Sequence, residues 1–151
     1  MIVAPAGLKC RATQEYAGGT GNIAGAGAGG TFRRWATFGT VGGNKYYYYI
    51  IEGIGGRSHI VAEASLQAAL INLSPEGKGA KDFSQLSNLN GGDFLRFVSA
   101  TGGACVGIRK YGPSSSGGFK WILYATRCAQ RGKTISDSDI GNLITATGYR
   151  S

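Results

Sequence analysis

Two runs rich in aromatic and β-branched residues occupy 31–40 and 45–52, on either side of the segment 41–44, Val-Gly-Gly-Asn. Such side chains suit the pleated surface of a strand, and Gly and Asn adopt the positive φ of a tight turn. The pattern therefore predicts a β-hairpin. Its second strand carries four consecutive tyrosines, Tyr46 to Tyr49, and successive strand residues point to opposite faces. These tyrosines must line both faces of the hairpin.

Similar runs return in the second half of the chain. Residues 93–101 and 104–111 flank Gly102-Gly103, which predicts another hairpin with a two-residue turn. Residues 119–128, rich in Trp, Ile, Leu and Tyr, predict one further strand.

Helical spacing is clearest in the segment 59–73. Its apolar residues recur at intervals of three and four, as expected for one face of a helix: Ala62, Leu66, Ala69, Leu70 and Leu73. Near the C-terminus, Ser136 and Asp139 have the spacing of a capping box, which predicts a short helix through Leu143 or Ile144.

The order of these elements favours an α+β fold. We expect a mostly antiparallel sheet of five or six strands, covered on one face by the helix 59–73, with a short C-terminal helix. Residues 17–30 contain seven glycines and form low-complexity sequence. We therefore divide the chain into an extended, Gly-rich N-terminal arm over 1–30 and a single α+β domain over 31–151.

The net charge of +8, from 16 basic and 8 acidic residues, favours anionic partners such as nucleic acid or an acidic protein. The small basic loop 78–81, Lys-Gly-Ala-Lys, is typical of a solvated segment. No apolar run reaches the roughly 18 residues that a membrane-spanning helix needs. We expect no membrane span.

Residues suited to catalysis or metal binding are few. The chain has one histidine, His59, and eight carboxylates, most of which a helix cap or a loop explains. The cysteines Cys10, Cys105 and Cys128 have no Cys-x-x-Cys spacing, which disfavours zinc. They are expected to be reduced, partly buried thiols, or one of them carries a covalent group. We expect a protein that is not an enzyme.

Binding is the better supported class of function, because basic residues lie next to aromatic ones in the predicted strands. Tyrosine and tryptophan are enriched where proteins dock, and rings beside cations also hold single-stranded nucleic acid. The candidate partner-binding residues are Arg33, Arg34, Trp35, Lys45, Tyr47, Tyr49, Arg109, Lys110, Tyr111, Lys120 and Trp121.

The stretch 7–18, Gly-Leu-Lys-Cys-Arg-Ala-Thr-Gln-Glu-Tyr-Ala-Gly, resembles the cysteine-bearing hairpin of cryptophyte phycobiliprotein α subunits and of red-algal phycobilisome scaffold proteins. The matching residues are Arg11, Ala12, Glu15, Tyr16 and Gly18, and Cys10 stands at the position that attaches a bilin in that family. The chain departs from the family at Thr13, where the family has proline, and it lacks one residue after Cys10.

The resemblance implies a light-harvesting antenna linker that carries a bilin on Cys10 and binds acidic protein subunits of a large assembly, at the thylakoid surface of a plastid. Phycobilisome linkers are typically basic, as this chain is. Two alternatives stay open. One is a viral coat or tail protein, and the other is a single-stranded nucleic-acid-binding protein.

Overall fold

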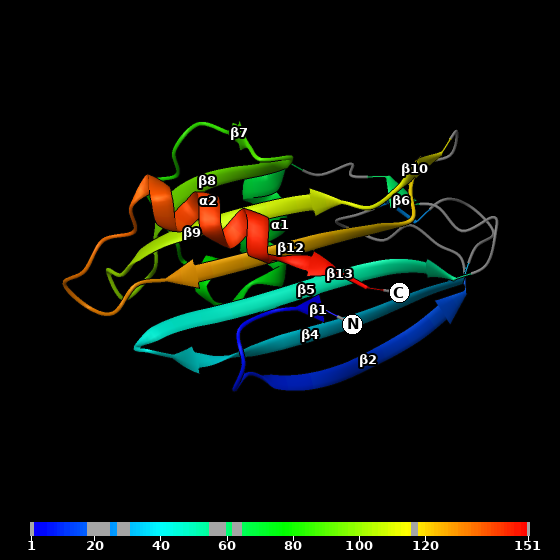
Figure 1. The fold of residues 1–151 in the computed structure, drawn as a ribbon, viewed down its shortest axis with the longest axis horizontal. Coiled ribbons are helices and arrows are strands. Elements are labelled where there is room, and N and C mark those ends of the chain that lie inside the picture. The colour runs from blue at the N-terminus through cyan, green and yellow to red at the C-terminus, as the bar shows by residue number, and fades with distance from the viewer. Residues whose placement is uncertain are drawn as a thin grey trace.

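The computed structural model describes residues 2–17, 25–26, 31–54, 60–61, 65–115 and 118–150; within these ranges, the side chains of 10–17, 25–26, 31, 61 and 115 lie outside the description. A seven-stranded, wholly antiparallel sheet dominates the described residues (Figure 1). From one edge to the other its strands are β2 (Lys9–Ala17), β4 (Thr31–Val41), β5 (Asn44–Ile54), β12 (Trp121–Cys128), β9 (Ala104–Tyr111), β8 (Gly92–Val98) and β7 (Ser87–Leu89).

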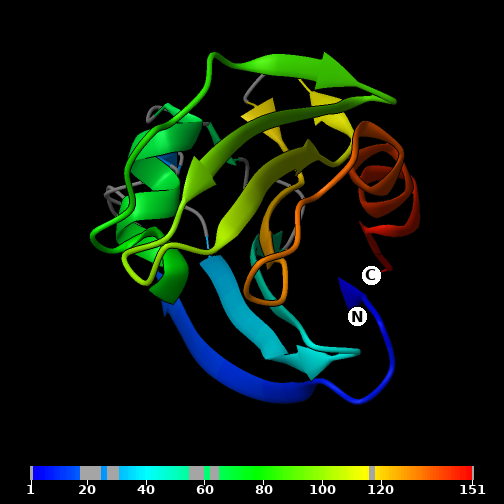
Figure 2. The same ribbon diagram turned by 90° about the vertical axis from the view of Figure 1, so that its left-hand side faces the viewer.

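One helix covers each face of this sheet. Helix α1 (Leu66–Leu73) and helix α2 (Asp137–Ala146) lie on opposite sides (Figure 2). The α+β class, the mostly antiparallel sheet and the covering of one face by α1 are confirmed, and α2 packs on the second face. The sheet has seven strands where five or six were expected, because residues 9–17 and 87–89 add one strand at each edge.

Strand alternation produces two separate hydrophobic cores. On the α1 side, Leu70 packs with Ile51, Phe97 and Ile122, whereas on the α2 side Ile144 packs with Ile50. Full burial of such a side chain stabilises the fold by roughly 1.5–3 kcal/mol. Glycine permits the close approach of α1, because a Cβ on Gly107 would lie 2.1 Å from a methyl group of Leu70.

The first predicted hairpin is confirmed, with its turn at 41–44. Val41 pairs with Asn44, and Gly42 and Gly43 adopt φ values of +58° and +81°. The second hairpin differs from its prediction, because Val98 pairs with Ala104 and five residues, 99–103, form the connection. Ser99 accounts for the longer loop, since its side chain accepts a hydrogen bond from the Gly103 N–H at 3.1 Å.

The two helices differ in how well their starts were predicted. The capping box of Ser136 and Asp139 is confirmed, and α2 continues to Ala146. Helix α1, by contrast, begins only at Leu66, where Ser65 accepts a hydrogen bond from the Ala68 N–H. The prediction of a helix from residue 59 is wrong at Ile60–Val61, which form strand β6. Residues 55–59 and 62–64, including His59 and Ala62, lie outside the described residues.

Two small sheets complete the described fold. Strands β1 (Ile2–Val3) and β13 (Gly148–Tyr149) join the two ends of the chain. Strands β10 (Ser114–Ser115), β11 (Gly118–Phe119), β6 (Ile60–Val61) and β3 (Gly25–Ala26) form a four-stranded sheet. Each of β1, β2 and β3 thus pairs with a strand from 31–151.

Candidate functional site: an aromatic groove at the basic end of the sheet

The four tyrosines of β5 divide between the two faces of the sheet, as strand alternation requires. Tyr48 is buried in the α2-side core, and Tyr46 stacks on it with ring centroids 6.3 Å apart. Tyr49 packs against the α1-side core, and Tyr47 stacks on Phe38 of β4 at 6.3 Å. Both Tyr47 and Tyr49 remain partly exposed.

A groove of about 570 Å³ lies on the α1 side of the β4–β5 hairpin. We call it the aromatic groove. Its walls combine rings from the two strands with the short helix η1 (Pro75–Gly77), which follows α1; the lining residues include Ala36, Phe38, Lys45, Tyr47, Tyr49, Pro75 and Glu76. Its volume is within the range of pockets that hold small ligands.

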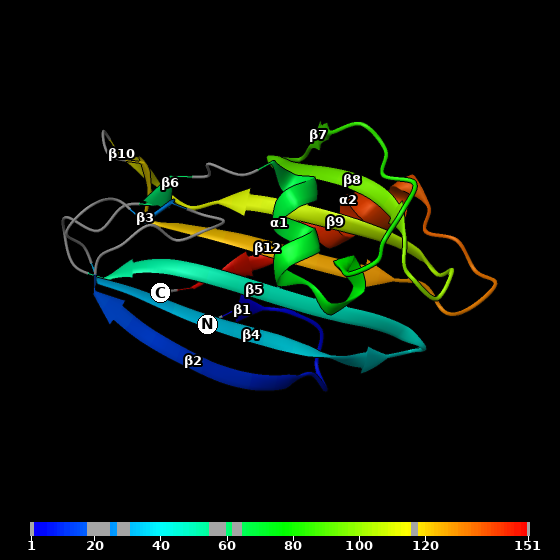
Figure 3. The same cartoon turned by 180° about the vertical axis from the view of Figure 1, so that it is seen from behind.

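The groove exists because α1 is only eight residues long and crosses the other half of the sheet. Seen from behind, α1 passes over β8, β9 and β12, while β4 and β2 extend beyond it (Figure 3). Glu76 belongs to helix η1, which follows α1 at the edge of the helical layer. The Glu76 carboxylate lies 3.8 Å from Lys45 Nζ of β5. This ion pair joins the end of the helical layer to the hairpin.

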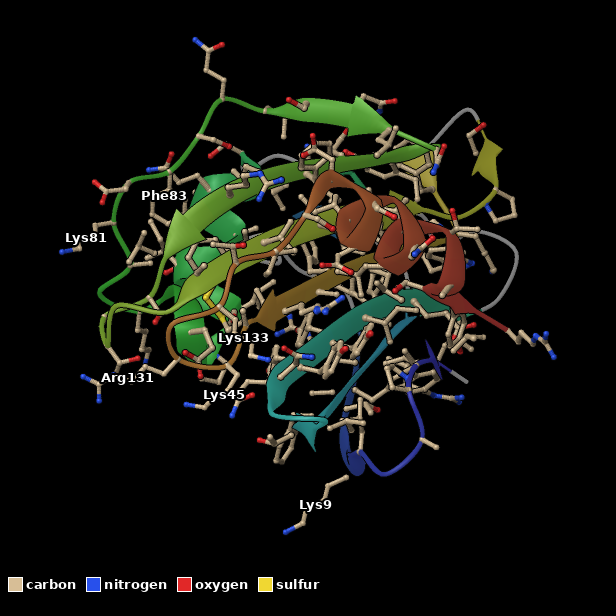
Figure 4. All side chains as sticks on the ribbon, turned by 60° about the vertical axis from the view of Figure 1, so that its left-hand side comes forward. Lys9, Lys45, Lys81, Phe83, Arg131 and Lys133 are labelled. Atoms are coloured by element: carbon tan, nitrogen blue, oxygen red, sulfur yellow. A yellow bond between two sulfur atoms is a disulfide. The ribbon has the colours of Figure 1, made fainter. Side chains whose placement is uncertain are left out.

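Exposed cations lie along the end of the sheet that holds the β4–β5 turn. Among the described residues of the adjoining segments 9, 41–45, 75–83, 99–103 and 129–135, every lysine and arginine is exposed: Lys9, Lys45, Lys78, Lys81, Arg131 and Lys133. Figure 4 shows five of these side chains along one end of the molecule. The carboxylates of the same segments are Glu76 and Asp82. We call this surface the basic end.

A smaller hollow of about 300 Å³ lies between the loops of the basic end, next to the aromatic groove. Lys45 and Glu76 line both hollows, and the smaller one continues between the loops past Gln130 and Arg131. A bound chain segment could therefore contact the rings of the groove and the cations of the loops together.

The predicted site residues do not form one surface. Lys45, Tyr47 and Tyr49 line the aromatic groove, and Arg34 points to the same face by alternation along β4. Arg33 and Trp35 lie on the α2 face, where the Arg33 guanidinium is 5.4 Å from the Trp35 ring.

Trp35 and Trp121 serve mainly to hold the C-terminal strand. Their rings lie 5.4 Å and 5.8 Å from the ring of Tyr149 in β13. The Tyr149 hydroxyl donates a 2.6 Å hydrogen bond to Glu52, and burial, together with this carboxylate, raises the pKa of Tyr149. This cluster closes the α2 face over the hairpin.

Arg109 and Tyr111 belong to a buried polar network on β9. Arg109 is 7 % exposed, and its Nη2 donates to Asp93 Oδ2 at 3.1 Å. The Tyr111 hydroxyl donates to the same oxygen, and burial raises the pKa of Tyr111 to about 12. Their positions suit a structural role better than contact with a partner.

Lys110 and Lys120 lie away from the basic end. The Lys110 Nζ donates to the carbonyl oxygens of Ile144 and Thr147 at 2.8 Å and 2.7 Å, so it caps the C-terminus of α2, and burial lowers its pKa. Lys120 is partly exposed next to β12, at the strand end remote from the β4–β5 turn.

The cysteines depart from the expectation of reduced thiols. Cys105 and Cys128 occupy paired positions on β9 and β12 and form a disulfide on the α1 face. Their separation of 23 residues carries no motif, so only the strand register reveals the pair. Cys10 lies in β2, but its side chain is outside the described part, and the attached bilin stays a prediction.

Three features of the site leave little trace in the sequence. Phe38 lies opposite Tyr47 only through the hairpin register, and Glu76 reaches Lys45 only through the packing of η1. Arg131 and Lys133 come from the loop after β12, which carries no motif. Hairpin alternation was the one signal that could have selected Phe38 in advance.

The described residues contain no group of three or more His, Cys, Asp or Glu side chains placed to hold a metal ion. No helix among them is long and apolar enough to cross a membrane. Family models, curated proteins and solved structures were compared with the chain, and none matches it.

Proposed function

We propose that this is a non-enzymatic assembly protein that binds an acidic protein partner through its basic end and aromatic groove. The observation that carries the proposal is that six exposed cations, from separate segments, lie at the sheet end that also holds Lys45 of the aromatic groove. Cations at a rim steer a partner of opposite charge, and rings in a hollow supply most of the holding energy.

A direct test measures binding of a fluorescein-labelled poly-glutamate peptide to the full chain by fluorescence anisotropy. We expect binding at low salt that weakens as salt rises, because exposed charges are screened. The double variant Arg131→Glu/Lys133→Glu should lose at least about tenfold in affinity. The matched control is Arg150→Glu, which changes an exposed charge after β13 and should change affinity much less.

Single-stranded nucleic acid is the competing class of partner. Glu76 argues against it, because every nucleotide carries a charge that this carboxylate repels, whereas a protein segment can place an uncharged residue in the groove. An oligonucleotide of equal charge that binds more tightly than poly-glutamate, and loses this affinity in Tyr47→Ala, would overturn the proposal of a protein partner.

Within the assembly class, the resemblance of residues 7–18 favours a light-harvesting antenna linker with a bilin on Cys10. Material from the native source should then keep visible absorbance on the denatured polypeptide. A colourless chain would remove the pigment and leave the binding proposal intact. The viral coat or tail alternative predicts that the isolated chain self-assembles, which sedimentation velocity measures.

A further inference from the structure

The aromatic groove has a composition different from that of the basic end next to it. Its walls are mainly Ala36, Phe38, Tyr47, Tyr49 and Pro75, and its polar lining residues include Lys45 and Glu76, which are 3.8 Å apart. A surface that bound only charge would need no such apolar hollow. The groove therefore suits a large, apolar group of a bound partner.

We propose that the aromatic groove receives a tryptophan or tyrosine side chain from the acidic segment that binds the basic end, with Glu76 accepting a hydrogen bond from that side chain. The inference rests on the proposed function, since it names the anchor of the same partner. The expected partner is therefore an acidic peptide segment that contains at least one tryptophan or tyrosine.

The shape and chemistry of the hollow support an aromatic anchor. A ring inserted beside Tyr47 and Tyr49 would meet aromatic faces and edges, and such pairs add about 0.5–1.5 kcal/mol beyond the area they bury. Tyr and Trp are also the residues most often found as anchors in well-packed interface pockets. A volume of about 570 Å³ leaves room for the ring and its neighbouring backbone.

Glu76 explains why the anchor should carry a hydrogen-bond donor. Its side chain is 24 % exposed, so it is largely desolvated while remaining in contact with the groove. A carboxylate accepts hydrogen bonds, and indole N–H and phenol O–H groups are donors that phenylalanine lacks. Hydrogen bonds to a charged acceptor are stronger than neutral ones.

Charge complementarity indicates that the residues on either side of the aromatic anchor are acidic. The hollow shared by Lys45 and Arg131 begins where the groove ends, so acidic residues next to the anchor would lie over the cations. The carboxylate of Glu76 lies between the two parts and disfavours a negative charge inside the groove itself. A segment with an uncharged ring between acidic neighbours would place the ring in the groove and the acidic side chains next to the cations.

The experiment compares three labelled peptides of identical net charge, rich in Glu and Asp, with Trp, Phe or Ala at the central position. Anisotropy is measured with the full chain at low salt. We expect the Trp peptide to bind at least about tenfold more tightly than the Ala peptide, with the Phe peptide between them. In Tyr47→Ala the advantage of Trp over Ala should fall to near one. In Glu76→Gln the advantage of Trp over Phe should shrink.

Leu86→Ala is the matched control, because Leu86 is a 54 % exposed apolar residue next to β7, at the opposite edge of the sheet from β2 and β4. It should leave all three affinities unchanged. A thermal melt of each variant checks that the fold is retained.

The outcomes separate the two proposals. Equal binding of the three peptides would overturn the aromatic anchor and leave the basic end as the binding surface. Absence of binding by all three at low salt would overturn the proposed function. A Trp advantage that survives in Tyr47→Ala, in a variant that melts as a folded protein, would place the anchor outside the groove and overturn the inference.

Discussion

The two faces of the β4–β5 hairpin both carry aromatic residues, but one face is covered and the other is partly exposed. On the α2 face, Tyr48 and Trp35 are covered by α2 and by the strand pair β1–β13, which holds Tyr149 against the tryptophan. On the α1 face, Tyr47 and Tyr49 line a groove, because α1 is too short to reach across the hairpin. Aromatic residues alone therefore do not distinguish a core from a binding surface, whereas the length of the covering element does.

The largest contrast is expected between adjacent tyrosines. Tyr48→Ala removes a ring that is 1 % exposed and should reduce the free energy of unfolding by about 3–5 kcal/mol. Tyr47→Ala should reduce it by less than about 1 kcal/mol, because its ring already contacts solvent. Guanidinium denaturation measures both. Equal losses in the two variants would mean that the groove is closed in solution.

A second contrast concerns two arginines, of which the sequence selected only Arg109 as a candidate for partner binding. Arg109→Ala leaves the carboxylate of Asp93 largely buried without its ion pair, and should cost roughly 3 kcal/mol of stability. Arg131→Ala removes an exposed cation of the basic end and should change stability by no more than about 0.5 kcal/mol. Urea denaturation, followed by circular dichroism, compares the two. A stable Arg109→Ala variant would contradict the structural role of this residue.

Alkaline pH provides a test of the covered face without changing its packing. Burial raises the pKa of Tyr48 to about 12, although hydrogen bonding to Thr147 acts in the opposite direction. The unfolded chain ionises this tyrosine near pH 10, so its contribution is fully present below pH 10 and is lost as the pH rises towards 12. The expected loss of stability is on the order of 2 kcal/mol.

The measurement is chemical denaturation of the wild type and of Tyr48→Phe between neutral pH and pH 12. The variant keeps the ring and lacks the ionisable hydroxyl, so its stability should decline less over this interval. Tyr111 contributes to the decline that remains, since burial raises its pKa in the same way. Parallel declines in the two proteins would show that Tyr48 is not buried in the neutral form.

A small effect is also expected at the rim of the groove. Glu76→Gln removes the ion pair with Lys45, whose side chain is 59 % exposed, and solvent screening limits its contribution to about 0–1 kcal/mol. The variant should therefore fold almost as stably as the wild type in thermal denaturation. A large loss of stability would mean that the ion pair secures η1 to the sheet. Binding by this variant would then be compared only at temperatures where its denaturation curve shows a folded protein.

Local patterns were sufficient for much of the fold. Alternation and turn residues predicted the β4–β5 hairpin with its turn at 41–44, and the spacing of Ser136 and Asp139 predicted the start of α2. These features depend on interactions between residues close in the chain, which the sequence displays directly. Segment 9–17 shows neither clear alternation nor turn residues. It forms a strand because it pairs with β4.

The site depended on contacts between distant segments. Alternation required that Tyr47 and Tyr49 share a face, but it could not tell which face would be covered, since that depends on where α1 ends and where β13 returns to the sheet. The same limit applies to Cys105 and Cys128, which meet only through the register of β9 and β12. Composition established that the protein is basic. Only the packing of its loops brought Lys45, Arg131 and Lys133 to one end, because the positions of side chains on separate loops are set by the sheet that connects them.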